Sequence, residues 1–213
     1  MIAIEKHDSV ALVRMDSGEN RFNRQSIDEW HTVLDETEAI EGPLALVTTG
    51  MGKFYSNGLD LDWMLGEGSG DTTLLDDVHR LLVRILDFPA ITVAAVNGHA
   101  FAAGAMLATA HDIVVMREDR GYWCLPEVDL GLPLTSTMFE VVASHLPRAT
   151  LRSSLLTGRR FGGAQAIDAG IAHELAPEHD VVPHAIERAQ GLATKDRHVI
   201  IEHKRMLRMD SAR

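Results

Sequence analysis

The sequence predicts one globular domain of the α/β class. The chain has 213 residues, 46% of them hydrophobic, and a chain of this size buries about 70% of the surface that it exposes when unfolded. Short apolar runs rich in β-branched residues alternate with longer runs of helical periodicity. This alternation favours an α/β fold around one core, and nothing in the composition calls for a second domain.

The expected elements follow in order along the chain. Strands are expected at residues 2–6, 10–15, 44–49, 91–96, 112–116, 121–124 and 171–175. Helices are expected at 26–39, 73–87, 103–110, 135–145, 148–156, 163–169, 179–193 and 197–207. The helix at 73–87 has the clearest pattern, because its aliphatic residues form one apolar stripe. The glycine-rich segment 66–71 is expected to be a mobile surface loop.

A turn of small residues follows the expected strand at 91–96. Gly98 breaks the strand, and a helix of small apolar residues is expected to begin near Ala103. The first N–H groups of a helix lack partners within the helix and favour negative charge. Because Ala103 and Gly104 have small or no side chains, a ligand could approach these donors closely. The turn is therefore a candidate oxyanion site.

Two further segments have a related character. The segment 54–61, Phe-Tyr-Ser-Asn-Gly-Leu-Asp-Leu, also follows an expected strand, so it could supply a second backbone donor. In the segment 125–133, Glu127 stands among apolar neighbours. Burial would raise the pKa of this carboxyl and suit it to proton transfer.

Together these segments resemble the crotonase, or enoyl-CoA hydratase/isomerase, family. The resemblance is carried by F-Y-S-N-G-L-D-L at 54–61, V-N-G-H-A-F-A-A-G-A-M-L-A at 96–108 and P-E-V-D-L-G-L at 126–132, and it extends through 156–172. It implies a spiral of strand–strand–helix units that form two roughly perpendicular sheets surrounded by helices. The spiral core would span 1–175, and a short C-terminal helical region would span 176–213.

The resemblance also implies a site and a substrate. A coenzyme A thioester would be held with its carbonyl oxygen between two backbone N–H groups, those of Leu59 and Ala103, while Glu127 moves a proton. No metal and no separate cofactor are expected, because coenzyme A is part of the substrate. The expected substrate-binding residues are Asn57, Gly58, Asp60, Gly104 and Met106.

The residue type at position 106 distinguishes between two reactions of this family. Hydratases of the family carry a glutamate at this position and a second one at the position of Glu127. A thioether cannot activate water, so the sequence favours the single-glutamate Δ3,Δ2-enoyl-CoA isomerases, in which one carboxylate takes a proton from C2 and delivers one to C4. Plant-type members of that branch share the S-N-G-L-D-L and E-V-D patterns.

Two alternatives to the isomerase stay open. Hydration or other enolate chemistry would need a second acid, for which Asp60, Asp62 and Asp129 are candidates; in an extended segment, Asp129 would share a face with Glu127. Asn57 and Asp60 have simpler explanations as turn and N-cap residues, and Met106 as core filling. Loss of the first glutamate also fits a non-catalytic acyl-CoA binder.

The net charge and the motifs that the sequence lacks limit the classes of ligand and partner to be expected. A formal charge of −11 disfavours nucleic-acid binding, and it requires local cations for the anionic coenzyme, for which Arg21, Arg24 and Lys53 are candidates. The sequence has no G-x-S-x-G elbow, no H-E-x-x-H pair and no phosphate-binding loop. The single cysteine, the lack of a signal peptide or spanning segment and the poor match of the final Ser-Ala-Arg to a peroxisomal signal favour the cytoplasm. The resemblance implies a homotrimer or hexamer.

Overall fold

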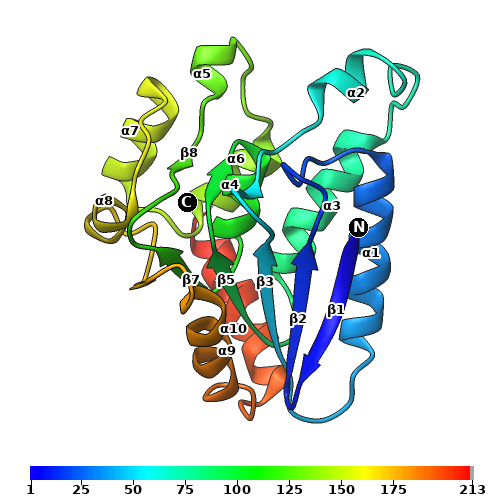
Figure 1. Ribbon diagram of the computed structural model, residues 1–213, viewed down its shortest axis with the longest axis vertical. Coiled ribbons are helices and arrows are strands. Elements are labelled where there is room, and N and C mark those ends of the chain that lie inside the picture. The colour runs from blue at the N-terminus through cyan, green and yellow to red at the C-terminus, as the bar shows by residue number, and fades with distance from the viewer. Residues whose placement is uncertain (212–213) are drawn as a thin grey trace.

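The computed structural model describes residues 1–211, so most of the final Ser-Ala-Arg lies outside it. The described part has nine strands in two sheets and ten helices (Figure 1). The strands are β1 (Ile2–His7), β2 (Val10–Met15), β3 (Ala45–Gly50), β4 (Phe54–Ser56), β5 (Ile91–Val96), β6 (His99–Phe101), β7 (Ile113–Arg117), β8 (Trp123–Cys124) and β9 (Glu174–Ala176). The helices are α1 (Arg24–Glu38), α2 (Leu61–Leu65), α3 (Leu74–Leu86), α4 (Ala103–Thr109), α5 (Glu127–Leu130), α6 (Ser136–Ala143), α7 (Arg148–Thr157), α8 (Gly163–Asp168), α9 (Val181–Gln190) and α10 (Arg197–Ser211).

The larger sheet has six strands in the order β1-β2-β3-β5-β7-β9. Only β1 runs antiparallel to its neighbour, and the other pairs are parallel. One face packs against α9 through Val47 and Val93 of the sheet and Ala185 of the helix. The other face belongs to the main core, with α1, α3 and α4. Burial on both faces explains why the central strands are continuous apolar runs.

The smaller sheet consists of three parallel strands in the order β4-β6-β8. Each of these strands follows a strand of the larger sheet and precedes a helix, which gives three successive units: β3-β4-α2, β5-β6-α4 and β7-β8-α5. The strand–strand–helix repeat that the resemblance implied is therefore present. Because β4, β6 and β8 are parallel neighbours, their carboxyl ends lie at one edge.

All the expected strands and helices are present, with shifted ends. The strands expected at 121–124 and 171–175 are shorter and occupy 123–124 and 174–176. The prediction lacked β4, β6, α2 and α5, each of five residues or fewer. Elements of this length span little more than one period of strand alternation or one helical turn, so hydrophobic spacing does not reveal them.

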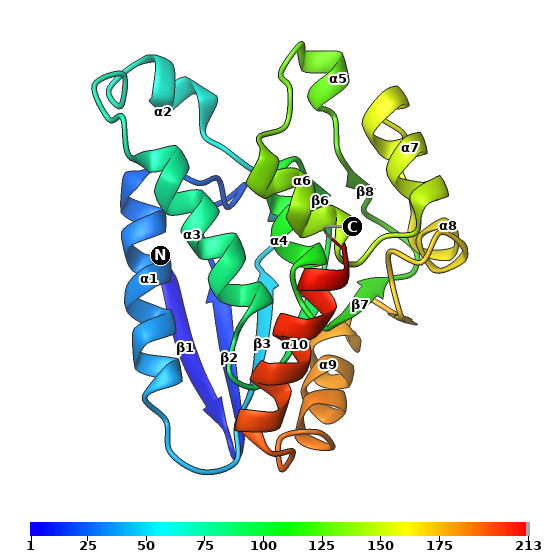
Figure 2. The ribbon, with the colours of Figure 1, turned by 180° about the vertical axis from the view of Figure 1, so that it is seen from behind.

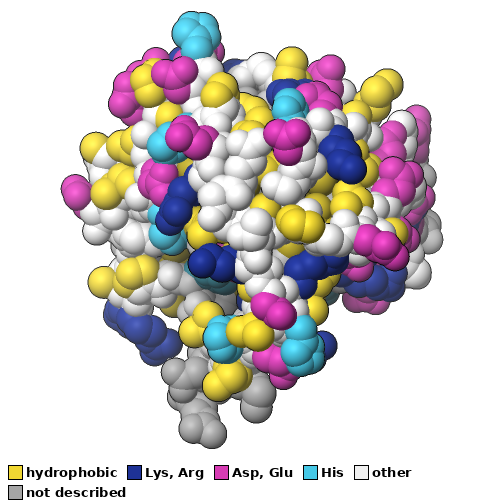
Figure 3. Space-filling view, turned by 90° about the horizontal axis from the view of Figure 1, so that it is seen from below, with side chains coloured by type: hydrophobic (Ala, Val, Ile, Leu, Met, Phe, Trp, Pro, Cys, Tyr) yellow, Lys and Arg dark blue, Asp and Glu magenta, His cyan; other side chains and the backbone are white. Residues whose placement is uncertain are grey.

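The C-terminal region is helical, as expected, and α10 packs on the body of its own chain. Figures 1 and 2 place α9 and α10 together at the lower end, opposite α2 and α5. The buried Lys204 of α10 donates hydrogen bonds to the carbonyls of Phe88 and Ala90 and pairs with Asp112 at 2.8 Å. Viewed from below, acidic and basic side chains are interspersed (Figure 3), so neither charge dominates that face. No helix within 1–211 is both long enough and apolar enough to cross a membrane.

Candidate active site

Three groups of the candidate site lie at equivalent points of the three strand–strand–helix units. Leu59 follows β4, Ala103 follows β6 and begins α4, and Glu127 follows β8 and begins α5. The parallel pairing of β4, β6 and β8 brings these segments to one edge of the small sheet. The repeat of the fold therefore gathers residues that are 44 and 24 positions apart in the sequence.

The backbone N–H groups of Leu59 and Ala103 have no hydrogen-bond partner within the described residues. Their neighbours are fixed: Phe22 bonds the Gly58 carbonyl at 2.7 Å, and the Ala102 N–H bonds the Cys124 carbonyl at 3.0 Å. Ala102 itself has φ +51° and ψ −128°, a conformation that is rare for a residue with a side chain. Unpaired donors beside a strained residue are typical of a functional site.

Glu127 supplies the buried carboxyl group of this site. Its side chain is buried, and its Oε2 atom has no hydrogen-bond partner in the described structure. Burial removes water from the carboxylate and thereby raises the pKa of Glu127. A carboxyl with a raised pKa and a free oxygen can accept and return a proton.

A cavity of about 540 Å³ joins these groups. Leu59, Ala103 and Glu127 all line it. Much of the remaining wall is apolar and comes from Leu61, Met64, Leu75, Phe101, Leu130, Leu132, Pro133 and Met138. Its polar side chains include Arg21, Asn57, Asp62, Thr135 and Arg160. An apolar cavity with a few convergent polar groups is suited to a largely apolar ligand.

Comparison with known proteins agrees with this architecture. The family model described as enoyl-CoA hydratase/isomerase matches residues 5–212. The chain belongs to this family. It is 34% identical over 207 residues to enoyl-CoA delta isomerase 3 of Arabidopsis thaliana, across 92% of this chain and 86% of the relative. It is 35% identical to the peroxisomal enoyl-CoA delta isomerase 2 of the same organism, with the same coverage.

Solved structures of the family share the fold. A probable enoyl-CoA hydratase, EchA3 of Mycobacterium tuberculosis, superposes with a TM-score of 0.91 at 28% identity, across 99% of this chain and 89% of that one. A second structure of the same protein, an apo form named an enoyl-CoA isomerase, gives a TM-score of 0.87 at 27% identity, with 99% and 92% covered. The expected crotonase fold is confirmed.

Within this hydratase/isomerase chain, five of the expected site residues line the cavity: Arg21, Asn57, Leu59, Ala103 and Glu127. Met106 does not line it, because its side chain is fully buried in the core. Asp60 also lies outside the cavity lining and instead caps α2 by accepting a hydrogen bond from the Trp63 N–H at 3.2 Å. The structure thus supports the core and capping explanations for Met106 and Asp60.

Gly58 and Gly104 shape the site through their lack of a side chain. A Cβ atom on Gly104 would lie 2.3 Å from the Ser56 carbonyl oxygen, so this glycine allows α4 to pack against β4. A Cβ atom on Gly58, which has φ +78°, would lie 3.0 Å from the Ala103 nitrogen. The glycine at 58 therefore keeps the space in front of one unpaired donor open.

The expected cations differ in position. Arg21 lines the cavity, where it donates to Glu19 and Asp62 at 2.7 and 2.9 Å. Lys53 is exposed and lies over the Phe54 ring, outside the cavity. Sequence reasoning missed Arg160, which lines the cavity and lies 5.7 Å from the Phe101 ring centre. Its only sequence signal is its place in the resemblance at 156–172.

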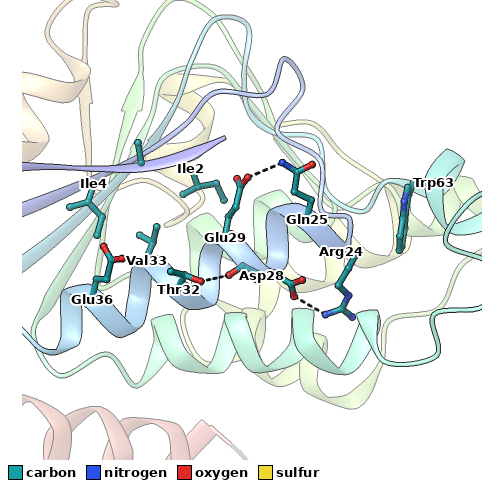
Figure 4. A pocket seen from close by; sticks show the side chains of 11 residues that line it. Ile2, Ile4, Arg24, Gln25, Asp28, Glu29, Thr32, Val33, Glu36 and Trp63 are labelled. Atoms are coloured by element: carbon teal, nitrogen blue, oxygen red, sulfur yellow. Dashed lines mark hydrogen bonds and ion pairs between the residues drawn. The ribbon is translucent and has the colours of Figure 1, made fainter.

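Arg24 lines a separate groove between β1 and α1, which Figure 4 shows from close by. Its guanidinium donates to Asp71 and Asp77 at 2.9 and 2.8 Å and to Asp28 at 3.1 Å. These bonds tie α1 to α3 and to the segment before it, so the structure does not bring Arg24 to the cavity. Asp71 is anchored in the same way, at the end of the segment expected to be a loop.

Asp62 lines the same cavity as Glu127, but none of the three aspartates considered as a second acid is buried as Glu127 is. Asp60 caps α2, and the side chain of Asp62 is 91% exposed and paired with Arg21. Asp129 was expected to share a face with Glu127 in an extended segment, and that expectation is wrong. Residues 127–130 form α5, in which Glu127 is buried while Asp129 is exposed. Residues two apart on a helix point in different directions.

Proposed function

We propose that the protein is a Δ3,Δ2-enoyl-CoA isomerase with Glu127 as its single proton carrier. The observation that carries the proposal is the buried, unpartnered carboxylate oxygen of Glu127 in a cavity that also contains two unpaired backbone N–H groups. The names of the Arabidopsis relatives, enoyl-CoA delta isomerases, support it.

In the proposed reaction the thioester oxygen accepts hydrogen bonds from the N–H groups of Leu59 and Ala103. The Glu127 carboxylate takes a proton from C2, and the electron pair moves toward this oxygen to give a dienolate. Glu127 then returns the proton to C4, and the double bond comes to lie between C2 and C3. Each oxyanion donor of this kind typically contributes about 3 kcal/mol to the stability of the transition state.

Coenzyme A would contact the two cationic side chains that line the cavity. Arg21 and Arg160 line the cavity and are suited to contact its anionic groups, whereas Arg24 lines a separate groove and Lys53 is outside the cavity. We therefore retain Arg21 as a candidate ligand of coenzyme A and add Arg160. Substitution of Arg24 or Lys53 should have little effect on coenzyme A binding. The family relationship also suggests a homotrimer or hexamer, which light scattering of the purified protein would test.

The compartment belongs to the same set of proposals. The composition favours the cytoplasm, but two Arabidopsis relatives, enoyl-CoA delta isomerases 1 and 2, are named peroxisomal. Immunolocalisation of the native chain in its own cells would decide between the two.

The decisive experiment compares 3-enoyl-CoA and 2-enoyl-CoA as substrates for the wild type and E127Q, with mass spectrometry to detect added water. The proposal predicts isomerisation of the 3-enoyl substrate without a mass change, reduced by at least about 10²-fold in E127Q. The amide keeps the shape of the side chain but cannot accept the proton, so acyl-CoA binding should persist. A gain of water would establish hydration, and binding without turnover would establish a non-catalytic acyl-CoA binder.

A further inference from the structure

One polar side chain interrupts the apolar part of the cavity between the first turns of α3 and α6. Leu75, Leu132, Pro133 and Met138 form the walls there, and among these described neighbours only Thr135 carries a polar side chain. Neither Glu127 chemistry nor the contacts proposed for coenzyme A use this hydroxyl.

The hydrogen bonds of Thr135 leave one position open. Its Oγ1 accepts from the Met138 N–H at 3.3 Å, as an N-cap of α6, and lies 2.9 Å from Nε2 of His79 on α3. A hydroxyl has one donor and two acceptor positions. If His79 donates, the Thr135 O–H is free to donate; if His79 accepts, one lone pair of Oγ1 is free to accept.

His79 can take either role because it also reaches solvent. Its side chain is 17% exposed and lines an outer depression beside Asp76 and Arg80. The imidazole is therefore not locked by a second buried partner: its Nδ1 lies 3.9 Å from an Asp76 oxygen, beyond hydrogen-bond distance. Thr135, which lines the cavity, therefore keeps an open donor or acceptor position according to the tautomer of His79.

We propose that the Thr135–His79 pair selects thioesters whose acyl chain carries a hydroxyl group. The inference rests on the proposed acyl-CoA function, since it concerns the far end of the same ligand. A ligand hydroxyl both donates and accepts, so it matches the open position of Thr135 in either tautomer. A carboxylate fits less well, because the described residues that form the wall around Thr135 include no lysine or arginine to offset its burial.

The test measures binding apart from turnover. Calorimetry would give the Kd of hexanoyl-, octanoyl- and decanoyl-CoA and of their terminally hydroxylated counterparts, for the wild type, T135V and T135S. T135S retains the hydroxyl and the cap and serves as the matched control for T135V. H79L removes the hydrogen-bond partner and leaves the Thr135 hydroxyl in place.

The proposal predicts that at least one hydroxylated chain binds the wild type about five-fold more tightly than its plain counterpart, the effect of one net hydrogen bond. T135V should bring the affinities of each hydroxylated chain and its plain counterpart together, T135S should keep the preference, and H79L should reduce it. Equal affinity for plain and hydroxylated chains at every length would overturn the inference. That result would leave the proposed isomerase intact, because turnover of plain 3-enoyl-CoA is measured separately.

Discussion

Glu127 and Ala102 both occupy positions that cost folding free energy. Glu127 has a buried carboxylate oxygen without a partner, and Ala102 adopts a φ of +51°. Strain of the second kind costs about 1–3 kcal/mol per residue and persists where the surrounding structure enforces it. Ala102 lies next to the unpaired N–H of Ala103, and Glu127 lies on the facing segment. The cost in folding free energy therefore falls at the proposed reaction centre.

The raised pKa of Glu127 should appear in the pH dependence of activity. The base must be ionised to take the C2 proton, so kcat/KM should fall as the pH decreases through the pKa of Glu127 in the free enzyme. Because burial raises this pKa, the acid limb should lie above the ordinary glutamate value of 4.5. A profile of kcat/KM against pH checks this, and an acid limb at or below 4.5 would contradict it.

The same shift predicts the stability of E127Q. The folded protein holds the Glu127 proton more tightly than the unfolded chain, so the contribution of this group to stability is full below the unfolded pKa and is lost as the pH rises through the folded pKa. E127Q should therefore be more stable than the wild type at neutral pH, and the difference should shrink below pH 4.5. Urea unfolding at both pH values gives the free energies, and a less stable variant at neutral pH would refute the argument.

At the scale of elements, the three short strands β4, β6 and β8 decide the site. Hydrophobic periodicity predicted the long strands and helices but neither β4 nor β6, and it assigned β8 a longer span than the structure shows. The segments that follow these strands were recognisable in the sequence, because their glycines and small residues favour turns independently of how the strands pair. Their meeting at one edge depends on the parallel pairing of the small sheet, which no local pattern reports.

Gly58 offers an element-level test of the turn after β4. G58A would place a Cβ atom 2.9 Å from the Ala102 Cβ and 3.0 Å from the Ala103 nitrogen, which blocks one proposed oxyanion donor. We expect kcat/KM to fall by about 10²-fold, the usual cost of losing one such donor. Steady-state kinetics with 3-enoyl-CoA measures the loss.

G18A is the matched control. Gly18 also has a positive φ, +69°, but a Cβ atom there would meet nothing within 4 Å. Both variants should lose about 1 kcal/mol or more of stability because alanine is strained in this conformation, and only G58A should lose activity. If G58A and G18A lost activity equally, backbone strain rather than the blocked Ala103 N–H would explain the loss.

At the scale of the whole molecule, a buried polar network connects the sheet with the helical layer. His111 is fully buried after α4, with Nδ1 2.8 Å from the Leu107 carbonyl and Nε2 2.9 Å from the Thr48 hydroxyl of β3. The Thr48 hydroxyl also lies 2.7 Å from the Tyr55 hydroxyl. Burial lowers the pKa of His111 to about 4, so the imidazole is neutral in the folded protein at neutral pH.

This histidine should make the fold sensitive to acid. Between pH 6.5 and about 4 the unfolded chain binds a proton that the folded chain does not, so stability should fall by roughly 3 kcal/mol as the pH decreases through this window. H111Q should be less stable at neutral pH and lose less on acidification. Denaturant unfolding at several pH values measures both slopes, with the exposed-histidine variant H198Q as control; parallel slopes for H111Q and the wild type would contradict the prediction.

The sequence by itself determined the fold class and the family, because three of its segments resemble those of the family, and it predicted Leu59, Ala103 and Glu127 as the central groups of the site, because glycine-rich turns and a carboxylate in an apolar run are local signals. Only the tertiary structure decided which cations line the cavity, that Asp129 turns away from Glu127, and that Thr135 meets His79 across 56 residues of sequence. Those facts depend on how distant segments pack against one another, and the geometry of packing is set by the whole core rather than by any short stretch of residues.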